Sequence, residues 1–397
     1  MEQVNIQKRI DSIDVLRGIA MIVMALDHVR DYFHISANVD DPLNLATTSP
    51  ALFATRWITH FCAPIFIFLS GTSIYLQSLK KSKKELSLFL IKRGLWLVIV
   101  EFALVTLAWT FNPFYNVFIF QVIWTIGISM ILLGVLIYIP YSFILGLGLI
   151  LVCGHNILDH FEASANYSSN FVKDILHHGF FTPYEIWKNH YALIVYAFPV
   201  WTGVMMLGYC FGIFFTNKFT KEARQKVFIR MGIGLLIIFV AMRYFNLYGD
   251  PSGWTSQKNY LFTFLSFINL DKYPPSLLYL FITIGPSIIL LGYLEDVKNW
   301  ATKPLQIFGR TAIFYYVLHI YLIHILATIA YFARGHSFSE VGNTGNFPFL
   351  FVVPGEGYGL EIVYLIWVLL ILLIYPLCKW YDGFKKSQVK KWWVSYV

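Results

Sequence analysis

The stretch Asp11-Ser12-Ile13-Asp14-Val15-Leu16-Arg17-Gly18-Ile19-Ala20, continued by Asp27-His28-Val29-Arg30-Asp31-Tyr32-Phe33-His34, decides the fold. Between its polar residues the chain is apolar, as in a membrane-spanning helix. At about 100° per residue, Asp14, Arg17 and His28 fall on roughly one third of the helix surface. Asp31 continues this polar stripe and Asp27 lies beside it. Because lipid does not solvate charges, the stripe is expected to face a protein interior or a water-filled cavity.

The composition is that of a membrane protein. Of the 397 residues, 57% are hydrophobic and 13% are charged, and the mean hydropathy is +0.62. These values exclude an ordinary soluble domain and a disordered chain. We expect an all-α polytopic membrane protein with one transmembrane domain over residues 1–397, in the plasma (inner) membrane if the source is bacterial.

About ten apolar runs are long enough to cross ~30 Å of hydrocarbon as helices. They lie near residues 13–30, 57–79, 94–112, 117–138, 142–157, 191–215, 229–248, 274–294, 307–330 and 359–380. The apolar stretch around residues 260–270 is shorter and is expected to be interfacial or re-entrant. Because Asp14 and Arg17 interrupt the first run, we expect a retained span rather than a cleaved signal peptide.

The distribution of lysine and arginine predicts the orientation in the membrane. With the N-terminus inside, most of the 30 basic residues fall in cytoplasmic segments. These residues are Lys8, Arg9, Lys80, Lys81, Lys83, Lys84, Lys92, Arg93, Lys218, Lys221, Arg224, Lys226, Arg230, Lys298, Lys303, Arg310, Lys379, Lys385, Lys386, Lys390 and Lys391. We therefore expect both termini in the cytoplasm. The same placement explains the net charge of +8, so no nucleic-acid partner is expected.

The histidines gather toward the opposite, outer side. Five of them fall in one outer segment: His155, His160, His177, His178 and His190. Two interpretations stay open for these five, namely the ordinary polarity of outer loops and chemistry in the outer half of the protein. The outer segments 158–190 and 331–358 are too short to fold alone. We expect both to be lids over a site in the membrane.

The polar end of the first span is the main candidate for catalysis. His28 and Asp31 are three residues apart on a helix, so a carboxylate of Asp31 or Asp27 is expected to orient the imidazole. A histidine held in this way can take a proton from an attacking hydroxyl or amine, or accept an acyl group itself. His34 is a second candidate, with Arg30 on a neighbouring face. The alternative interpretation is a satisfied polar cluster at a helix end.

Arg17 lies ~16 Å from His28 along the same helix face. An arginine at that depth in a membrane needs an acidic partner or a phosphate-bearing ligand. Two partners remain open. One is Asp14, three residues away on the same helix. The other is the phosphate or pantetheine arm of a cofactor that comes from the cytoplasm.

Further polar residues interrupt or flank the later apolar runs. We assign to the cofactor side Arg17, Gln121, Trp124, Arg310 and His319. We assign to the acceptor side Arg30, His60, Arg243, Asp250 and Lys272. Each of these residues alone is explained equally by an interhelical hydrogen bond or by anchoring at the membrane interface.

The four cysteines, Cys62, Cys153, Cys210 and Cys378, show no metal-binding or redox spacing. Because they lie in or beside apolar runs, we expect buried thiols. We also expect no metal ion. GxSxG, HExxH, CxxC and P-loop patterns are absent from the sequence, so a serine hydrolase, a zinc protease and a P-loop protein have no support.

Five motifs follow one another along most of the chain. They are Asp14-Val15-Leu16-Arg17-Gly18-Ile19-Ala20 with Asp27-His28, Ala63-Pro64-Ile65-Phe66-Ile67-Phe68-Leu69-Ser70-Gly71, Gln121-Val122-Ile123-Trp124, Lys272-Tyr273-Pro274-Pro275-Ser276-Leu277-Leu278, and Phe308-Gly309-Arg310 with Leu318-His319. This ordered set resembles the transmembrane acyltransferases, especially the catalytic-domain family of heparan-alpha-glucosaminide N-acetyltransferase. The first helix is also similar to that of the acyltransferase-three family. The resemblance implies acetyl transfer from cytoplasmic acetyl-CoA to an acceptor across the membrane, with either His28 or His34 as the catalytic histidine.

We therefore expect a transmembrane O- or N-acetyltransferase that moves an acetyl or other acyl group from acyl-CoA to a sugar-type acceptor on the outer side. Its expected partners are acyl-CoA, a glycan or other small acceptor and membrane lipid, and a homodimer is an open option. The alternative is a proton-coupled small-molecule transporter that relays protons along Asp14, Arg17 and His28.

Overall fold

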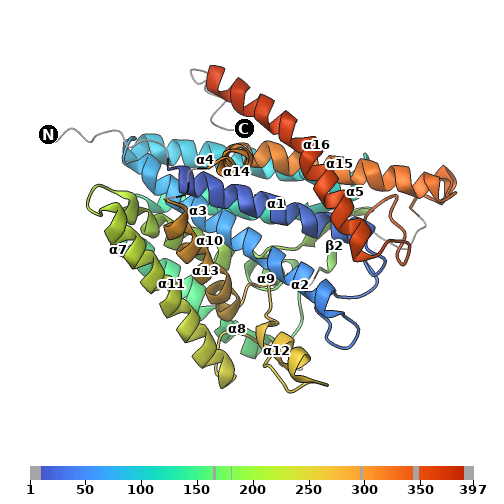
Figure 1. Cartoon of the computed structure of the whole chain (residues 1–397), viewed down its shortest axis with the longest axis horizontal. Coiled ribbons are helices and arrows are strands. Elements are labelled where there is room, and N and C mark those ends of the chain that lie inside the picture. The colour runs from blue at the N-terminus through green and yellow to red at the C-terminus, as the bar shows by residue number, and fades with distance from the viewer. Residues whose placement is uncertain are drawn as a thin grey trace.

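Helix α1 (Asp11–Phe33) runs through the middle of the molecule, where it contacts helices from the first and the last parts of the chain (Figure 1). The structure is a computed structural model and describes residues 10–163, 167–179, 181–295, 297, 299–342 and 348–388. The other helices are α2 (Pro50–Ile58), α3 (Cys62–Ser78), α4 (Lys83–Val100), α5 (Thr106–Thr110), α6 (Val122–Leu136), α7 (Tyr141–Gly154), α8 (Asn156–Glu162), α9 (Phe171–Leu176), α10 (Phe198–Phe211), α11 (Lys221–Tyr244), α12 (Tyr260–Ile268), α13 (Leu277–Leu294), α14 (Thr302–Arg310), α15 (Ala312–Ala333) and α16 (Leu360–Ser387). The strands are β1 (Val117–Phe120), β2 (Pro183–Trp187) and β3 (His190–Ile194).

Seven helical segments within the described residues are long and apolar enough to cross a membrane. They are Pro50–Ser78, Tyr141–Glu162, Phe198–Phe215, Lys221–Tyr244, Leu277–Leu294, Ala312–Ala333 and Leu360–Ser387. The protein is therefore a mostly helical integral membrane protein, as its composition predicts. Three further predicted spans coincide with α1, with α4 and α5, and with α6, which carry more charges or are shorter than these seven.

A small sheet departs from the all-α prediction. Strand β1 pairs in parallel with β3, and β2 pairs antiparallel with β3. β1 and β3 occupy the beginnings of the predicted spans 117–138 and 191–215, so the corresponding helices begin only at Val122 and Phe198. β1 consists entirely of β-branched and aromatic residues, which favour strands. Periodicity alone cannot distinguish such a short apolar strand from a helix.

Two other helix predictions can be compared with the structure. The predicted span 307–330 is divided at Thr311 into the short α14 and the long α15. The stretch around residues 260–270 forms α12, which has nine residues and is too short to cross a bilayer, as predicted.

α1 and α14 cross in close contact because each helix has a glycine at the crossing. A Cβ atom on Gly18 would lie 1.9 Å from the carbonyl oxygen of Leu305, and one on Gly309 would lie 1.9 Å from the carbonyl oxygen of Asp14. A larger residue at either position would force the helices apart. The crossing brings Arg310, the last residue of α14, beside the beginning of α1.

The cysteines follow their prediction with one exception. Cys62, Cys210 and Cys378 are buried, whereas Cys153 is exposed. Ile150, three residues before Cys153, is also exposed, so this face of α7 has no protein neighbour to bury the thiol. Among the basic residues used to predict orientation, five lie outside the described residues: Lys8, Arg9, Lys298, Lys390 and Lys391.

Candidate active site

A cavity of about 610 Å³, here called the outer cavity, lies beside the second half of α1. Met24, Asp27, His28 and Asp31 of α1 are among its lining residues. The second half of the polar stripe therefore faces a cavity inside the protein, as predicted. Both predicted lid segments contribute to the same lining, with Phe181 and Pro183 from 158–190 and Pro348, Phe349 and Val352 from 331–358.

A histidine from the other end of the chain orients His28. Nδ1 of His28 lies 2.7 Å from Nε2 of His319 on α15, and Nδ1 of His319 lies 3.0 Å from the carbonyl oxygen of Tyr315. A carbonyl oxygen only accepts, so His319 donates from Nδ1 and its Nε2 accepts from Nδ1 of His28. Nε2 of His28 then carries the lone pair, and among the described residues it has no hydrogen bond. The arrangement leaves one basic nitrogen available beside the outer cavity.

Asp27 and Asp31 do not orient His28, contrary to the interpretation from the sequence. Asp27 pairs with Arg30 at 2.9 Å and with Arg56 at 2.5 Å. Asp31 pairs with Arg30 at 2.5 Å. Because the two arginines are largely buried, these carboxylates are needed to neutralise them. His319 takes the orienting position that we expected of a carboxylate.

His34, the second candidate for the catalytic histidine, does not line the outer cavity. It follows the last residue of α1, where its Nδ1 lies 2.8 Å from Oγ of Ser36 and accepts from the backbone N–H of Ser36 at 3.2 Å. Partial burial and the nearby charge of Arg30 lower the pKa of His34 below its ordinary value. These contacts belong to a helix-ending turn rather than to a reaction site.

A second cavity, of about 370 Å³ and here called the inner cavity, lies beside the first half of α1. Its described lining includes four cationic residues and no acidic one: Arg17, Arg93, Arg310 and Lys385. Arg17 donates to the carbonyl of Leu69 at 2.8 Å and to Oγ of Ser73 at 2.7 Å, both on α3. Arg310 lies 3.3 Å from the carboxylate of Asp14 and 3.7 Å from those of Asp11 and Asp382, so its charge is largely balanced. The inner cavity is thus a basic chamber suited to an anion.

The two cavities are adjacent to each other. Four residues line both of them: Met24, Phe66, Val122 and Tyr316. His28 lies one helical turn beyond Met24, on the outer side of this boundary. A ligand that extends from the inner cavity past these four side chains therefore reaches His28 first among the histidines discussed here.

The other residues assigned to the cofactor side are distributed differently from the prediction. Arg310 lines the inner cavity, Gln121 lines the outer cavity, and His319 lies behind His28. Trp124 lines neither cavity. Its backbone N–H donates to Glu101 at 2.8 Å and its ring packs against Phe120 at 4.9 Å, because it lies in the first turn of α6 after β1. The ring of Trp124 therefore packs against β1 rather than facing either cavity.

Among the residues assigned to the acceptor side, only Lys272 lines the outer cavity. Arg30 and His60 are buried outside its lining. Arg243 donates to the carbonyl oxygens of Ser252, Ser266, Phe267 and Asn269, and lies 3.4 Å from Asp250. Through these contacts Arg243 holds the chain segment before α13 in place. Burial raises the pKa of Asp250 to about 7, with Asp271 adding to the effect.

Several lining residues were not assigned from the sequence. Arg56, Trp109 and Tyr273 line the outer cavity, and Arg93 and Lys385 line the inner one. The sequence predicts Arg93 and Lys385 only as cytoplasmic basic residues. Burial alone would raise the pKa of Tyr273, but the charges of Lys272 and Arg56 lower it. Tyr273 lies in the motif that begins at Lys272, and Arg56 lies at the start of the second predicted span. A polar residue at the end of a span was therefore the feature by which both could have been assigned to the site.

The fold and the site define a polytopic membrane protein with a histidine pair between a basic inner cavity and an outer cavity. A family model described as heparan-alpha-glucosaminide N-acetyltransferase, catalytic, matches residues 9–243, more than half of the chain. The chain belongs to this family of membrane acetyltransferases. The match includes His28 and Arg17, whereas His319, Arg310 and Lys385 lie beyond it. A comparison with curated proteins found no match.

Proposed function

We propose that the protein transfers an acetyl group from acetyl-CoA, bound through the inner cavity, to a hydroxyl or amine of a sugar-type acceptor in the outer cavity. The observation that carries the proposal is that His28, whose Nε2 has no hydrogen bond among the described residues, lines the outer cavity, which shares four lining residues with the inner cavity. Membership of a membrane acetyltransferase family supports the reaction class.

The inner cavity fits the donor by charge and by length. Acetyl-CoA carries its negative charge on phosphates at one end and its thioester at the other, with the uncharged pantetheine arm between them. Arg17, Arg93, Arg310 and Lys385 supply cations for the phosphates. Arg17 and His28 are eleven residues apart on α1, or ~16 Å, and this distance is left for the pantetheine arm. Longer acyl groups would have to fit between Met24 and Phe66.

His28 acts as a general base in the proposed reaction. Its Nε2 takes the proton of the acceptor hydroxyl or amine while the acceptor atom attacks the thioester carbonyl carbon. The new C–O or C–N bond forms, the C–S bond breaks, and the CoA thiolate leaves and receives the proton from His28. His319 holds Nδ1–H of His28 throughout and favours the required tautomer.

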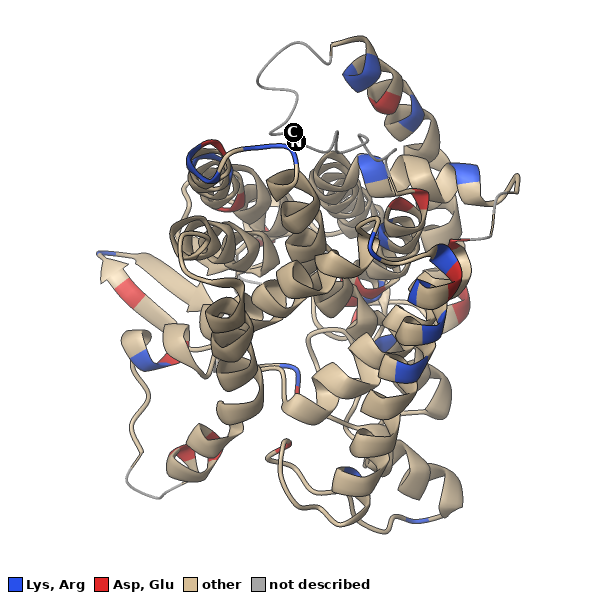
Figure 2. Ribbon diagram, turned by 90° about the vertical axis from the view of Figure 1, so that its left-hand side faces the viewer, with Lys and Arg blue, Asp and Glu red and all other residues tan. Residues whose placement is uncertain are grey.

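The proposed topology has ten spans with both termini in the cytoplasm of a plasma membrane. It adds α1, the continuous α4–α5 segment and α6 to the seven apolar spans. Strict alternation then puts the beginning of α4, the beginning of α11 and the end of α16 on one side. Basic residues gather at these helix ends. Figure 2, viewed from the left-hand side of Figure 1, shows blue segments on several helices.

The proposal is tested with the purified full-length protein in detergent. Binding of acetyl-CoA and its slow hydrolysis without acceptor are measured for the wild type, His28→Ala and His34→Ala, and glucosamine then serves as a probe acceptor. We expect His28→Ala to bind acetyl-CoA with near wild-type affinity and to lose hydrolysis and transfer. His34→Ala is the matched control, because it removes a histidine six residues away that does not line the cavity.

Failure of the wild type to bind acetyl-CoA would overturn the proposal. Proton flux in liposomes would then test the transporter alternative, since a transporter does not consume a thioester. Loss of hydrolysis in His34→Ala with full activity in His28→Ala would instead move the catalytic role to His34. An acetylated His28 trapped without acceptor would replace the general-base step by an acyl-enzyme.

A further inference from the structure

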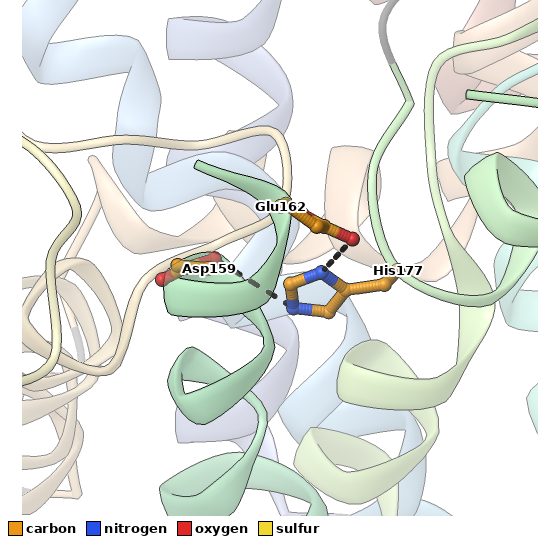
Figure 3. Close-up of side chains that lie close together, drawn as sticks. All are labelled: Asp159, Glu162 and His177. Atoms are coloured by element: carbon orange, nitrogen blue, oxygen red, sulfur yellow. Dashed lines mark hydrogen bonds and ion pairs between the residues drawn. The ribbon is translucent and has the colours of Figure 1, made fainter. Parts of the chain in front are cut away.

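A second group of titratable side chains lies where α8 meets the residue after α9 (Figure 3). The group, here called the His177 cluster, consists of His155, Asp159, Glu162 and His177. His155 and His177 are 7% and 3% exposed, and the side chains of Asp159 and Glu162 are 12% and 10% exposed. None of the four lines the outer or the inner cavity. The proposed acetyl transfer therefore does not use them.

Several potential metal-ligand atoms of the cluster lie close together. Nε2 of His177 lies 3.3 Å from Nδ1 of His155 and 3.8 Å from Oδ1 of Asp159. A tetrahedral ion with Zn–N and Zn–O bonds of about 2.0–2.1 Å holds its ligand atoms about 3.3 Å apart. The ligand atoms of Asp159, Glu162 and His177 all lie within 4.8 Å of one another.

Glu162 occupies the position of a supporting carboxylate. Its Oε1 lies 2.9 Å from Nδ1 of His177, on the side of the ring away from Asp159 (Figure 3). Metal-bound histidines commonly donate their second N–H to a carboxylate, which fixes the ring and strengthens the ligand. Asp159 is itself oriented by Asn156, whose Nδ2 donates to Oδ2 at 2.7 Å.

The charges of the cluster also favour a bound cation. No lysine or arginine among the described residues pairs with Asp159 or Glu162, whose polar partners are Asn156, Tyr167 and His177. His178 lies next to the cluster, with its ring 6.4 Å from that of His177. Two carboxylates at this burial are costly without a counter-charge.

Two buried atoms of the cluster are also unsatisfied. Oε2 of Glu162 and Nε2 of His155 have no hydrogen-bond partner among the described residues. Each is a polar atom that native proteins rarely leave unbonded. The four side chains therefore do not satisfy one another by themselves.

We propose that the His177 cluster binds one divalent first-row transition-metal ion, with zinc as the test ion. Its ligands are one ring nitrogen each of His155 and His177 and a carboxylate oxygen of Asp159, and Glu162 holds the second nitrogen of His177. Imidazole ligands favour this class of metal over calcium and magnesium. From the sequence we expect no metal site, because the cysteines show no metal-binding spacing and HExxH and CxxC patterns are absent.

The ion would be structural. It joins α8 to His177, and Phe181 and Pro183, four and six residues further along the chain, line the outer cavity. A bond at His177 would thus fix the beginning of the segment that covers the cavity. The proposal does not depend on the acetyltransferase reaction, and its test needs no activity measurement.

The test uses the full-length protein in detergent after removal of any purification tag. The protein is treated with a chelator, incubated with Zn²⁺ and dialysed, and bound zinc per chain is measured by inductively coupled plasma mass spectrometry. The melting temperature is recorded with and without zinc. We expect about one zinc per chain in the wild type, and a melting temperature that rises with zinc and falls again with chelator.

Two variants and one control locate the site. His177→Ala and the isosteric double variant Asp159→Asn/Glu162→Gln are expected to retain at least tenfold less zinc and to show no zinc-dependent melting shift. His160→Ala is the control, because His160 is exposed on the same helix, next to Asp159. If His177→Ala does not fold, the isosteric variant carries the comparison.

A wild type that retains no zinc overturns the proposal, as does equal zinc content in the wild type and the variants.

Discussion

Nδ1 of His28 and Nε2 of His319 lie 2.7 Å apart, although the two residues are separated by 291 positions in the chain. The contact links the first helix of the matched family region to a helix beyond it. His319 in turn donates to a backbone carbonyl of its own helix, so its tautomer is fixed by main-chain geometry. This pair leads to the first prediction.

His319→Leu should lower kcat of acetyl transfer by about a hundredfold, because Nδ1–H of His28 loses its acceptor and the ring loses its preferred tautomer. KM for acetyl-CoA should stay within about twofold, since His319 lines neither cavity. His319→Gln retains an oxygen acceptor and should recover part of the rate. Steady-state kinetics of the two variants check this prediction, and equal rates for both would contradict a positioning role.

Arg17→Ala should weaken the binding of CoA. Arg17 lines the basic inner cavity, and a hydrogen bond to a charged group contributes about 1.5–3 kcal/mol, which corresponds to a roughly 10- to 150-fold rise in Kd. Isothermal titration calorimetry with CoA measures the change. Lys226→Ala is the control, because Lys226 is an exposed basic residue of α11 outside the cavity. An equal loss in both variants would indicate a general charge effect.

Gly18→Ala should destabilise the protein by about 3 kcal/mol, the upper part of the usual range for overpacking. The new Cβ would lie 1.9 Å from a backbone oxygen of α14, which cannot move aside as a side chain could. The melting temperature in detergent reports the loss. Gly146→Ala is the matched control, since a Cβ there has no neighbour within 4 Å. An unchanged melting temperature in Gly18→Ala would show that the two helices are not in this close contact.

The stability of the segment before α16 should depend on pH through His336. Nδ1 of His336 lies 3.0 Å from Glu340, and Nε2 lies 2.7 Å from Glu356. Hydrogen bonds to Glu356 and then Glu340 raise the pKa of His336 above its ordinary value. Since the folded form binds the proton more tightly, the stabilisation is complete below a pH of about 6.5 and is lost as the pH rises through the raised pKa.

A comparison of wild type and His336→Gln checks this pH dependence. The difference in melting temperature between them should be largest at acidic pH and should shrink toward alkaline pH. A constant difference across the pH range would contradict the prediction.

The sequence allows the polar stripe of α1 to be predicted because helical periodicity is a local property. Arg17 and His28 follow one another along one face of α1. As expected for a polar stripe, Arg17 lines the inner cavity and His28 lines the outer cavity. The orienting partner of His28 could not be predicted in the same way. Asp31 is the neighbour in sequence, but Arg30 is nearer to it and more in need of a counter-charge. His319 reaches His28 only through tertiary packing.

The same distinction explains the errors in the fold. Val117–Phe120 is apolar enough for a membrane helix, and only its pairing with a strand some seventy residues later makes it β-structure. Arg243 and Asp250 have the charges of a ligand site. In the structure, however, Arg243 donates its hydrogen bonds to backbone carbonyls of α12 and of the loops beside it. Charge can be read from sequence, whereas the groups that neutralise it cannot.

The boundary formed by Met24, Phe66, Val122 and Tyr316 has a consequence for the energy balance of the cell. In the proposed topology, water-accessible chambers approach each other from both faces of a membrane that stores an electrochemical gradient. If the proposed reaction takes place there, the mostly apolar side chains at this boundary would insulate the membrane electrically while acetyl groups cross it. The enzyme would thereby modify acceptors on the far side without discharging the membrane that supports it.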